Sequence, residues 1–214
     1  TIQKEAAESA NLAKSRFLAV ASHDLRQPMH ALTLYLGTLD GNDLTDTARG
    51  NLANVRQCAQ TMDEMFRALL DISRLDAGAV PTDMRCFALQ MVLDRLRIEF
   101  EPQARAKGLT LKVRPCARAL YSDPDLLERV LRNLITNAIR YTRQGRVLVA
   151  CRRRGAKLRV GVYDTGMGIL QSEQRKIFEE FYQVGNPERD RTKGIGLGLA
   201  ILDRLAKLLA SPIT

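Results

Sequence analysis

A histidine and an acid stand side by side in the stretch SHDLRQP, which runs from Ser22 to Pro28. The leucines around it recur every seven residues: Leu18, Leu25, Leu32 and Leu39. This spacing is typical of the buried seam of a helical bundle. At about 100° per residue His23 lies roughly 140° from that seam, so we expect its imidazole to face solvent or a partner. An exposed His-Asp pair can bind a metal, exchange protons or be a surface group.

Two asparagines in the second half of the chain suggest a ligand. Asn133 and Asn137 are one helical turn apart in NLITNAIRYT and therefore share a helix face. Asparagine is unfavourable inside a helix, and its amide oxygen suits a hard cation such as Mg²⁺. The alternative is a pair of ordinary surface or capping asparagines.

Two glycine-containing motifs follow. DTGMGI, Asp164 to Ile169, comes directly after a predicted strand, where a carboxylate can accept a hydrogen bond from an adenine amine while the glycines let the backbone approach the base. GIGLGLAI, Gly194 to Ile201, opens a predicted helix and offers backbone amides to phosphate. It matches neither a P-loop nor GxGxxG. Each motif alone is also a common turn, and their joint occurrence with the asparagines indicates a nucleotide site.

Two kinds of periodicity divide the chain. Up to Asp76 the apolar spacing predicts two long helices, joined by a hairpin turn at Asp40 to Asp46. Such a hairpin leaves apolar surface uncovered, and we expect dimerisation into a four-helix bundle, with packing on the second half as the alternative. The boundaries predicted are a helical hairpin over 1–76, a linker over 77–85 and a second domain over 86–214.

The second domain mixes strand and helix periods and is predicted to be an α/β sandwich. Alternation predicts strands over 109–113, 147–151 and 158–163, and helical spacing covers 90–107, 125–141 and 197–209. The last two strands are joined by RRRGAK, which is too short for a parallel crossover, so they should pair antiparallel.

Composition limits the function classes. The chain has 214 residues and a formal charge of +9, with ten Lys or Arg and no acid from Arg129 to Tyr163. Aromatic residues for base stacking are few, so we favour an anion-attracting surface, for ATP or an acidic protein, over a nucleic-acid site. No apolar run could span a membrane and no signal peptide is apparent, which predicts a cytoplasmic location. The four scattered cysteines are expected to be reduced structural thiols.

These motifs, in this order, resemble the catalytic core of a two-component sensor histidine kinase over essentially the whole chain. The resemblance implies a dimerisation and histidine phosphotransfer hairpin, followed by a GHKL-type ATP-binding domain of the Bergerat fold. It implies that His23 takes the γ-phosphoryl group of ATP, with Asp24 polarising the imidazole. A receiver domain aspartate of a response regulator would then accept the phosphoryl group. His30 occupies the same heptad position without an acid beside it, and we expect a surface histidine.

The resemblance also implies a site for ATP and Mg²⁺. Asn137 and Asn133 would hold the metal, Arg140 would lie near the phosphates, Tyr141 against the adenine and Asp164 on its amino group. The other residues assigned to the nucleotide site by the resemblance are Gly166, Gly168, Ile169, Phe181, Lys193, Gly194, Gly196, Gly198 and Leu199. Val184 to Lys193 resembles the lid over ATP.

Two departures from the family pattern stand out. Gln27 occupies the position where many members carry threonine or asparagine for dephosphorylating the regulator, so the phosphatase role is open. The chain ends at SPIT, before the family's final hairpin and glycine box, so the ATP-binding domain is expected to be truncated. We expect an upstream sensor domain, through which the parent protein could be membrane-anchored, but no direct membrane insertion here. The rivals are a topoisomerase- or MutL-type ATPase and a degenerate, non-catalytic scaffold.

Overall fold

The structure is a computed structural model and describes residues 32, 36, 45–155, 157–184 and 196–213. These residues divide into two compact units. The first unit comprises the described residues within Thr1–Val80 and Glu179–Arg204, and the second those within Pro81–Phe178 and Leu205–Thr214. Within the described part of the chain, no helix is long and apolar enough to cross a membrane.

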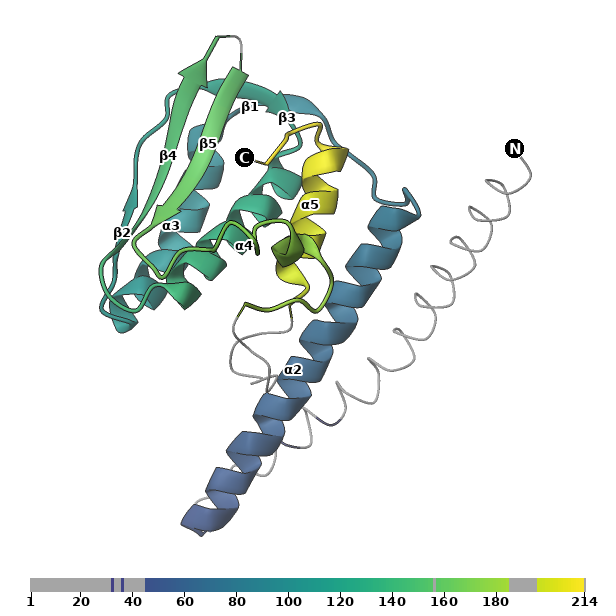
Figure 1. Ribbon diagram of the computed structural model, residues 1–214, viewed down its shortest axis with the longest axis vertical. Helices are drawn as coiled ribbons and strands as arrows, with labels where there is room; N and C mark the ends of the chain where they lie inside the picture. The colour runs from purple at the N-terminus through teal and green to yellow at the C-terminus, as the bar shows by residue number, and fades with distance from the viewer. Residues whose placement is uncertain (1–31, 33–35, 37–44, 156, 185–195, 214) are drawn as a thin grey trace, which may run out of the picture. The chain divides into compact units, whose positions relative to one another are not determined.

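Helix α2 (Asp46–Asp76) is the main element of the first unit (Figure 1). It begins at Thr45, whose hydroxyl accepts a hydrogen bond from the Ala48 amide at 3.3 Å. The sequence predicted that an acidic residue of the turn over 40–46 would cap this helix, whereas the N-cap residue is Thr45. Leu52 and Ala59 on the predicted apolar stripe form a buried cluster with Leu36. The second predicted helix is therefore confirmed, while the first lies mostly outside the described residues.

The second unit contains a mixed three-stranded sheet in the order β2–β4–β5. Strands β2 (Thr110–Val113) and β4 (Arg146–Arg154) run parallel, and β4 pairs antiparallel with β5 (Lys157–Asp164), as predicted. Helices α3 (Leu89–Ala106) and α4 (Pro124–Tyr141) lie on one face of this sheet (Figure 1). The α/β sandwich is thereby confirmed, with its core between this helix layer and the inner face of the sheet.

A second, two-stranded sheet was not predicted. Strand β1 (Arg85–Ala88) pairs antiparallel with β3 (Ala119–Ser122), with Phe87 opposite Leu120 on the side that packs against the core. The remaining elements are the short helix η1 (Lys176–Phe178) and helix α5 (Gly198–Leu208), which contributes residues to both units. Arg85, assigned to the linker from sequence, is the first residue of β1.

The expectation of four reduced cysteines is wrong for one pair. Cys116 and Cys151 form a disulfide, with Cα atoms 6.5 Å apart, whereas Cys58 and Cys86 are free. The chain after β2 continues alongside β4, because the Arg114 amide donates to the Val149 carbonyl at 2.9 Å. This pairing brings together two cysteines that are 35 residues apart in sequence. The spacing of cysteines along the chain cannot reveal such a neighbour.

Candidate functional site

Helix α4 carries the predicted asparagines on a face set by its cap and its buried stripe. The buried Asp123 carboxylate caps the helix by accepting from the amides of Asp125 at 2.9 Å and Leu126 at 3.0 Å. Leu131 and Ile135 pack into the core. The remaining members of the buried stripe are Leu126, Ala138 and Ile139. With this stripe against the sheet, the helix is fixed in rotation about its axis.

The two asparagines contact each other, as their spacing predicts. The Asn137 amide nitrogen donates to the Asn133 side-chain oxygen at 3.1 Å, and both side chains are half-buried. The contact joins two neutral amides and leaves the pair without net charge. Amide oxygens are ligands that Mg²⁺ accepts, so the donor types fit the metal that the resemblance implies. Among the described residues, no three His, Cys, Asp or Glu side chains form an alternative metal site.

Lys107 supports the end of α4 on which Arg140 and Tyr141 lie. Its ammonium donates to the carbonyl of Ile139 at 2.6 Å and to that of Arg140 at 2.7 Å. Carbonyls in the last turn of a helix lack helical partners and attract cations through the helix dipole. The lysine thus fixes this terminus, while the Arg140 and Tyr141 side chains are exposed. No local sequence pattern indicates this role, because it depends on a contact between distant segments.

The turn after β5 is held close to the end of α4. The Gly166 amide donates to the Asp164 carboxylate at 2.8 Å, and the Thr165 hydroxyl accepts from the Arg146 amide at 3.1 Å. A Cβ at Gly166 would lie 2.7 Å from the Tyr141 carbonyl oxygen, closer than side-chain carbons approach other atoms. Only glycine therefore allows the turn to lie against Tyr141. The structure brings together Tyr141, Asp164 and Gly166, and it adds Thr165, which the sequence motifs do not mark.

The surface around this turn is apolar. Gly168 has a φ of +70°, which favours glycine, and the neighbouring Ile169 side chain is 46% exposed. Met167 is more exposed still, at 76%. Thr142, directly after α4, is fully buried, and its hydroxyl has no hydrogen-bond partner among the described residues. Exposed apolar side chains can pack against an aromatic ring, and the exposed Asp164 carboxylate beside them can accept a hydrogen bond from the polar edge of that ring.

In the first unit, the backbone of Phe181 lies directly against Gly196. The Phe181 amide donates to the Gly196 carbonyl at 3.0 Å, and Phe181 has a φ of 63°, which is rare for a residue with a side chain. Gly196 has a φ of +78°, and a Cβ there would lie 2.8 Å from the Phe181 carbonyl carbon. Of the other predicted residues, Gly198 begins α5 and Leu199 is half-buried in its first turn.

An ion-pair cluster within the same unit was not predicted. The Arg204 guanidinium of α5 contacts Asp76 at the end of α2, with one nitrogen–oxygen distance of 2.6 Å, and Glu180 at 2.7 Å. The hydrogen bond to Asp76 is the main cause that raises the pKa of Arg204, with burial opposing it and the contacts to Glu180 adding to it. Arginine is already charged at working pH, so this cluster adds no pH dependence through Arg204.

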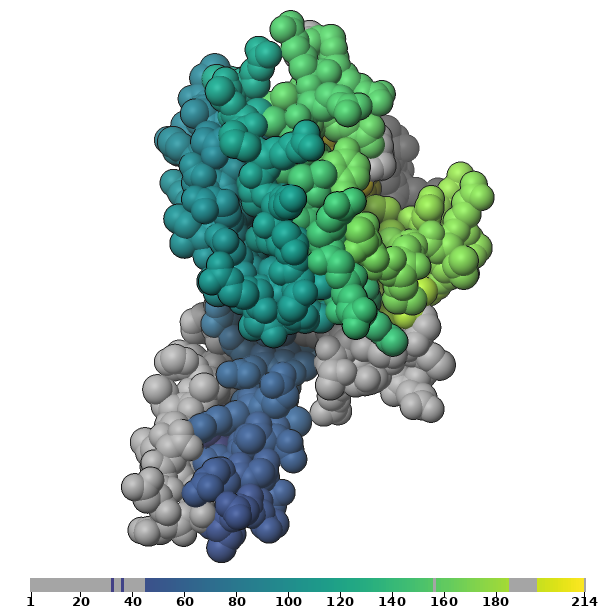
Figure 2. Space-filling view, turned by 90° about the vertical axis from the view of Figure 1, so that its left-hand side faces the viewer, coloured from purple at the N-terminus to yellow at the C-terminus, as the bar shows by residue number. Residues whose placement is uncertain are grey.

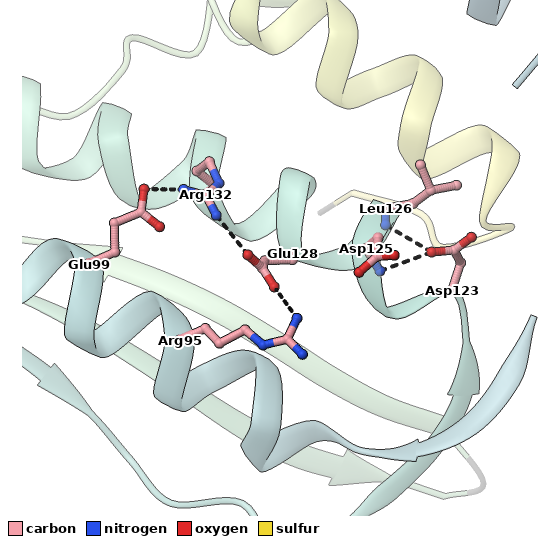
Figure 3. A network of polar contacts seen from close by, with 7 residues as sticks. All are labelled: Arg95, Glu99, Asp123, Asp125, Leu126, Glu128 and Arg132. Carbon is pink, nitrogen blue, oxygen red and sulfur yellow. Dashed lines mark hydrogen bonds and ion pairs between the residues drawn. The ribbon is translucent and has the colours of Figure 1, made fainter. Parts of the chain in front are cut away.

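A further polar network lies between α3 and α4 (Figure 3). Arg132 bridges Glu99 of α3 and Glu128 of α4, and the second bond measures 2.7 Å. Arg95 of α3 donates to the other oxygen of Glu128 at 3.2 Å. Two cations and two carboxylates therefore alternate across the pair of helices. This arrangement neutralises its own charge and offers no group for chemistry.

Five predicted site residues lie outside the described residues. They are His23, Asp24, Gln27, Lys193 and Gly194. The remaining predicted residues fall into the two groups above: those of α4 and the Asp164 turn in the second unit, and those around Gly196 in the first.

Comparison with known families matches both halves of the chain. Residues 13–78 match the His Kinase A (phospho-acceptor) domain, and residues 122–214 match the histidine kinase-, DNA gyrase B- and HSP90-like ATPase family. The first match contains His23, and the second contains the asparagines, the Asp164 turn and the glycines of the α5 segment.

Similar proteins are sensor kinases. The chain is 32% identical to the sensor protein GacS of Pseudomonas syringae over 99% of its own length, and 34% identical to the virulence sensor protein BvgS of Bordetella pertussis over 98%. It spans only 24% of that GacS and 18% of that BvgS. The crystal structure of full-length ShkA in complex with AMPPNP has 27% identity and a TM-score of 0.76, covering 91% of this chain and 41% of ShkA. The chain therefore belongs to the two-component sensor histidine kinases and comprises their catalytic core.

Proposed function

We propose that this chain transfers the γ-phosphoryl group of ATP to His23 and then passes it to an aspartate of a response regulator receiver domain. In the first step a nitrogen–phosphorus bond forms at the imidazole, the bond from the γ-phosphorus to the β–γ bridging oxygen breaks, and ADP leaves. In the second step a carboxylate oxygen of the receiver displaces the imidazole. The observation that carries the proposal is the close packing of Tyr141 against the Asp164–Gly166 turn, beside the asparagine pair on α4.

The α4 site would bind the nucleotide by its chemistry. Asp164 is exposed at the end of β5 beside the exposed Met167 and Ile169, which supports an adenine ring bound against these side chains with its amine on the carboxylate. The half-buried oxygens of Asn133 and Asn137 would hold Mg²⁺. Bound there, Mg²⁺ would neutralise charge on the phosphates, and Arg140 would add a second cation. By the resemblance, Gly194, Gly196, Gly198 and Lys193 would contact the triphosphate, and Gly168, Phe181 and Leu199 would contact the nucleotide.

The phosphoryl acceptor would be His23. It lies in the segment that matches the phospho-acceptor domain and is followed directly by Asp24. A carboxylate hydrogen-bonded to one ring nitrogen fixes the tautomer and leaves the other lone pair free to attack phosphorus. Gln27 could orient water in the reverse reaction, which makes phosphatase activity a separate question.

Exposed apolar side chains support a homodimer built on the helical hairpin. Val55 and Met62 belong to the predicted apolar stripe of α2, yet they are 43% and 44% exposed in the single chain. Leu32 of the leucine seam is 41% exposed. A second copy would cover these side chains in a four-helix bundle. The bundle would lie in the cytoplasm, and a sensor domain upstream in the parent protein would control it.

Nucleotide binding and phosphotransfer test the proposal together. The purified chain is incubated with γ-labelled ATP and Mg²⁺, and the labelled protein is then mixed with candidate receiver domains. We expect acid-labile label on the chain and its transfer to a receiver aspartate. The Asp164→Asn variant should bind ATP more weakly, whereas the matched Asp125→Asn variant, in the first turn of α4, should bind it normally. Hydrolysis of ATP without label on the protein would instead support a related ATPase.

A further inference from the structure

The hairpin between β4 and β5 carries cations that face one another. Strand β4 extends to Arg154 and β5 begins at Lys157, so that Arg152 stands opposite Arg159 and Arg154 opposite Lys157. Directly opposed residues in a sheet point to the same side, as do residues two apart along a strand. All four side chains are exposed. We call these four residues the basic ribbon.

The basic ribbon lies on the outer face of the sheet. Val147 and Val149 are fully buried, and they alternate with the outward positions on β4. Lys112 and Arg146 continue the same outer face toward the other end of the sheet. The only acid in the three strands is Asp164, whose register with Val147 places it on the opposite face. The three strands therefore place no carboxylate on the face of the ribbon, and Figure 2 shows the green side chains of this hairpin at the molecular surface.

This arrangement is unfavourable for the isolated chain. Like charges directly opposite each other in a sheet destabilise it. The hairpin contains two such pairs, Arg152 with Arg159 and Arg154 with Lys157. Packing does not require arginine at exposed positions, because any strand-forming polar residue would serve there. The ribbon instead creates a local positive field that attracts an anionic partner.

We propose that the basic ribbon docks an acidic helix of a protein partner. Opposed Cβ atoms across the strands are about 4.5–5.5 Å apart, and alternate positions along a strand about 6.6 Å. The Cβ atoms of acidic residues at i and i+4 on a helix are also about 5–6 Å apart, so their spacing matches that of the ribbon cations. The guanidinium forks of Arg152 and Arg154 suit bidentate contacts with carboxylates.

Two other polyanions fit less well. One exposed aromatic side chain, Tyr163, follows the ribbon on the same face of β5, and a single ring offers fewer stacking positions than successive nucleic-acid bases use. The one apolar side chain between its cations, Leu158, packs toward the core and cannot insert into a lipid surface. The proposal does not depend on kinase activity, because none of the ribbon residues belongs to the nucleotide site.

The test uses a helical peptide of about 20 residues with glutamates at every i, i+4 position, and a matched peptide with glutamine instead. Binding to the full chain is measured by fluorescence anisotropy at about 50 mM salt, where screening is weak. The triple variant R152Q/R154Q/K157Q should bind the glutamate peptide at least about tenfold more weakly than the unaltered chain. The control variant R49Q/R67Q/R97Q removes three exposed cations that have carboxylate partners on helices, and its affinity should change by less than about twofold.

The remaining outcomes decide the proposal. Thermal unfolding should show that the triple variant is at least as stable as the unaltered chain, because it removes like-charge pairs. Equal affinity in the two triple variants would overturn the proposal, as would equal binding of the glutamine peptide. Tighter binding of duplex DNA or of phosphatidylserine vesicles, lost in the ribbon variant, would reassign the ribbon to nucleic acid or membrane.

Discussion

Two polar faces of helix α4 differ in how their groups are partnered. Glu128 and Arg132 belong to a network with α3 in which each charge meets an opposite charge. Asn133 and Asn137, on an adjacent face, bond to each other as neutral amides. The first face joins two helices, while the second presents amide groups on the helix whose last residue, Tyr141, lies against the Asp164 turn. The carboxylates of the first face are already bonded to arginines, so this face serves packing. The second face carries uncharged amide oxygens, which are ligands for a hard cation and suit a metal–phosphate ligand.

Asn137→Ala should have the largest effect on activity. This variant removes one proposed Mg²⁺ ligand without creating a buried charge. We expect the rate of His23 phosphorylation to fall about 100-fold, the scale seen when one group that stabilises the transition state is lost. The melting temperature should stay nearly unchanged. Labelled ATP and thermal unfolding of the same preparation measure both, and a large loss of stability would mean that the asparagine face is structural.

Gly166→Ala should have the next largest effect. Its Cβ would come within 2.7 Å of the Tyr141 carbonyl oxygen and the Asp164 carboxylate, so the turn must move away from α4. We expect about tenfold weaker ATP binding and a stability loss of about 1–3 kcal/mol, as for other overpacked sites. Titration with ATP and chemical denaturation give the two values. Gly50→Ala is the matched control, because nothing lies within 4 Å of a Cβ there. Equal effects of the two changes on ATP binding would contradict the role of the close approach.

Lys107→Met tests positioning at a distance from the ligand. It removes the donor to the Ile139 and Arg140 carbonyls and keeps most of the apolar stem. We expect the KM for ATP to rise about three- to fivefold with kcat nearly unchanged, since the end of α4 would only loosen. Steady-state autophosphorylation at varied ATP separates the two constants. A fall in kcat alone would contradict this role.

Arg132→Met should have the smallest effect on activity. It leaves Glu99 without this bridge and Glu128 with Arg95 alone. We expect the free energy of unfolding to fall by about 1–2 kcal/mol, with less difference at high salt. Phosphorylation per folded molecule should not change. If it fell as far as in Asn137→Ala, the two faces of α4 would not be distinct.

The sequence predicted the elements with strong periodicity and missed those fixed by distant contacts. Helix α4 and the β4–β5 hairpin were clear, because apolar spacing and a short connection determine them locally. Strands β1 and β3 have four residues each and are stabilised by pairing across the chain, Arg85 with Ser122. The Cys116–Cys151 disulfide depends on the same kind of tertiary neighbour.

The same division applies to the candidate site. Residues whose side-chain type carries chemistry, such as Asn137 and Asp164, could be identified from the motifs. Lys107 and Thr165 act on backbone groups of other segments, and no local pattern marks such a role. The opposed cations of the basic ribbon depend on the register between β4, which extends to Arg154, and β5, which begins at Lys157.

Phosphorylation of paired histidine variants decides whether His23 is the phosphoryl acceptor. The unaltered chain, His23→Gln and His30→Gln are incubated with γ-labelled ATP and Mg²⁺, and acid-labile label and ATP affinity are measured for each. We predict label on the unaltered chain and on His30→Gln, none on His23→Gln, and similar ATP affinity in all three. Acid-labile label that persists in His23→Gln would contradict the account.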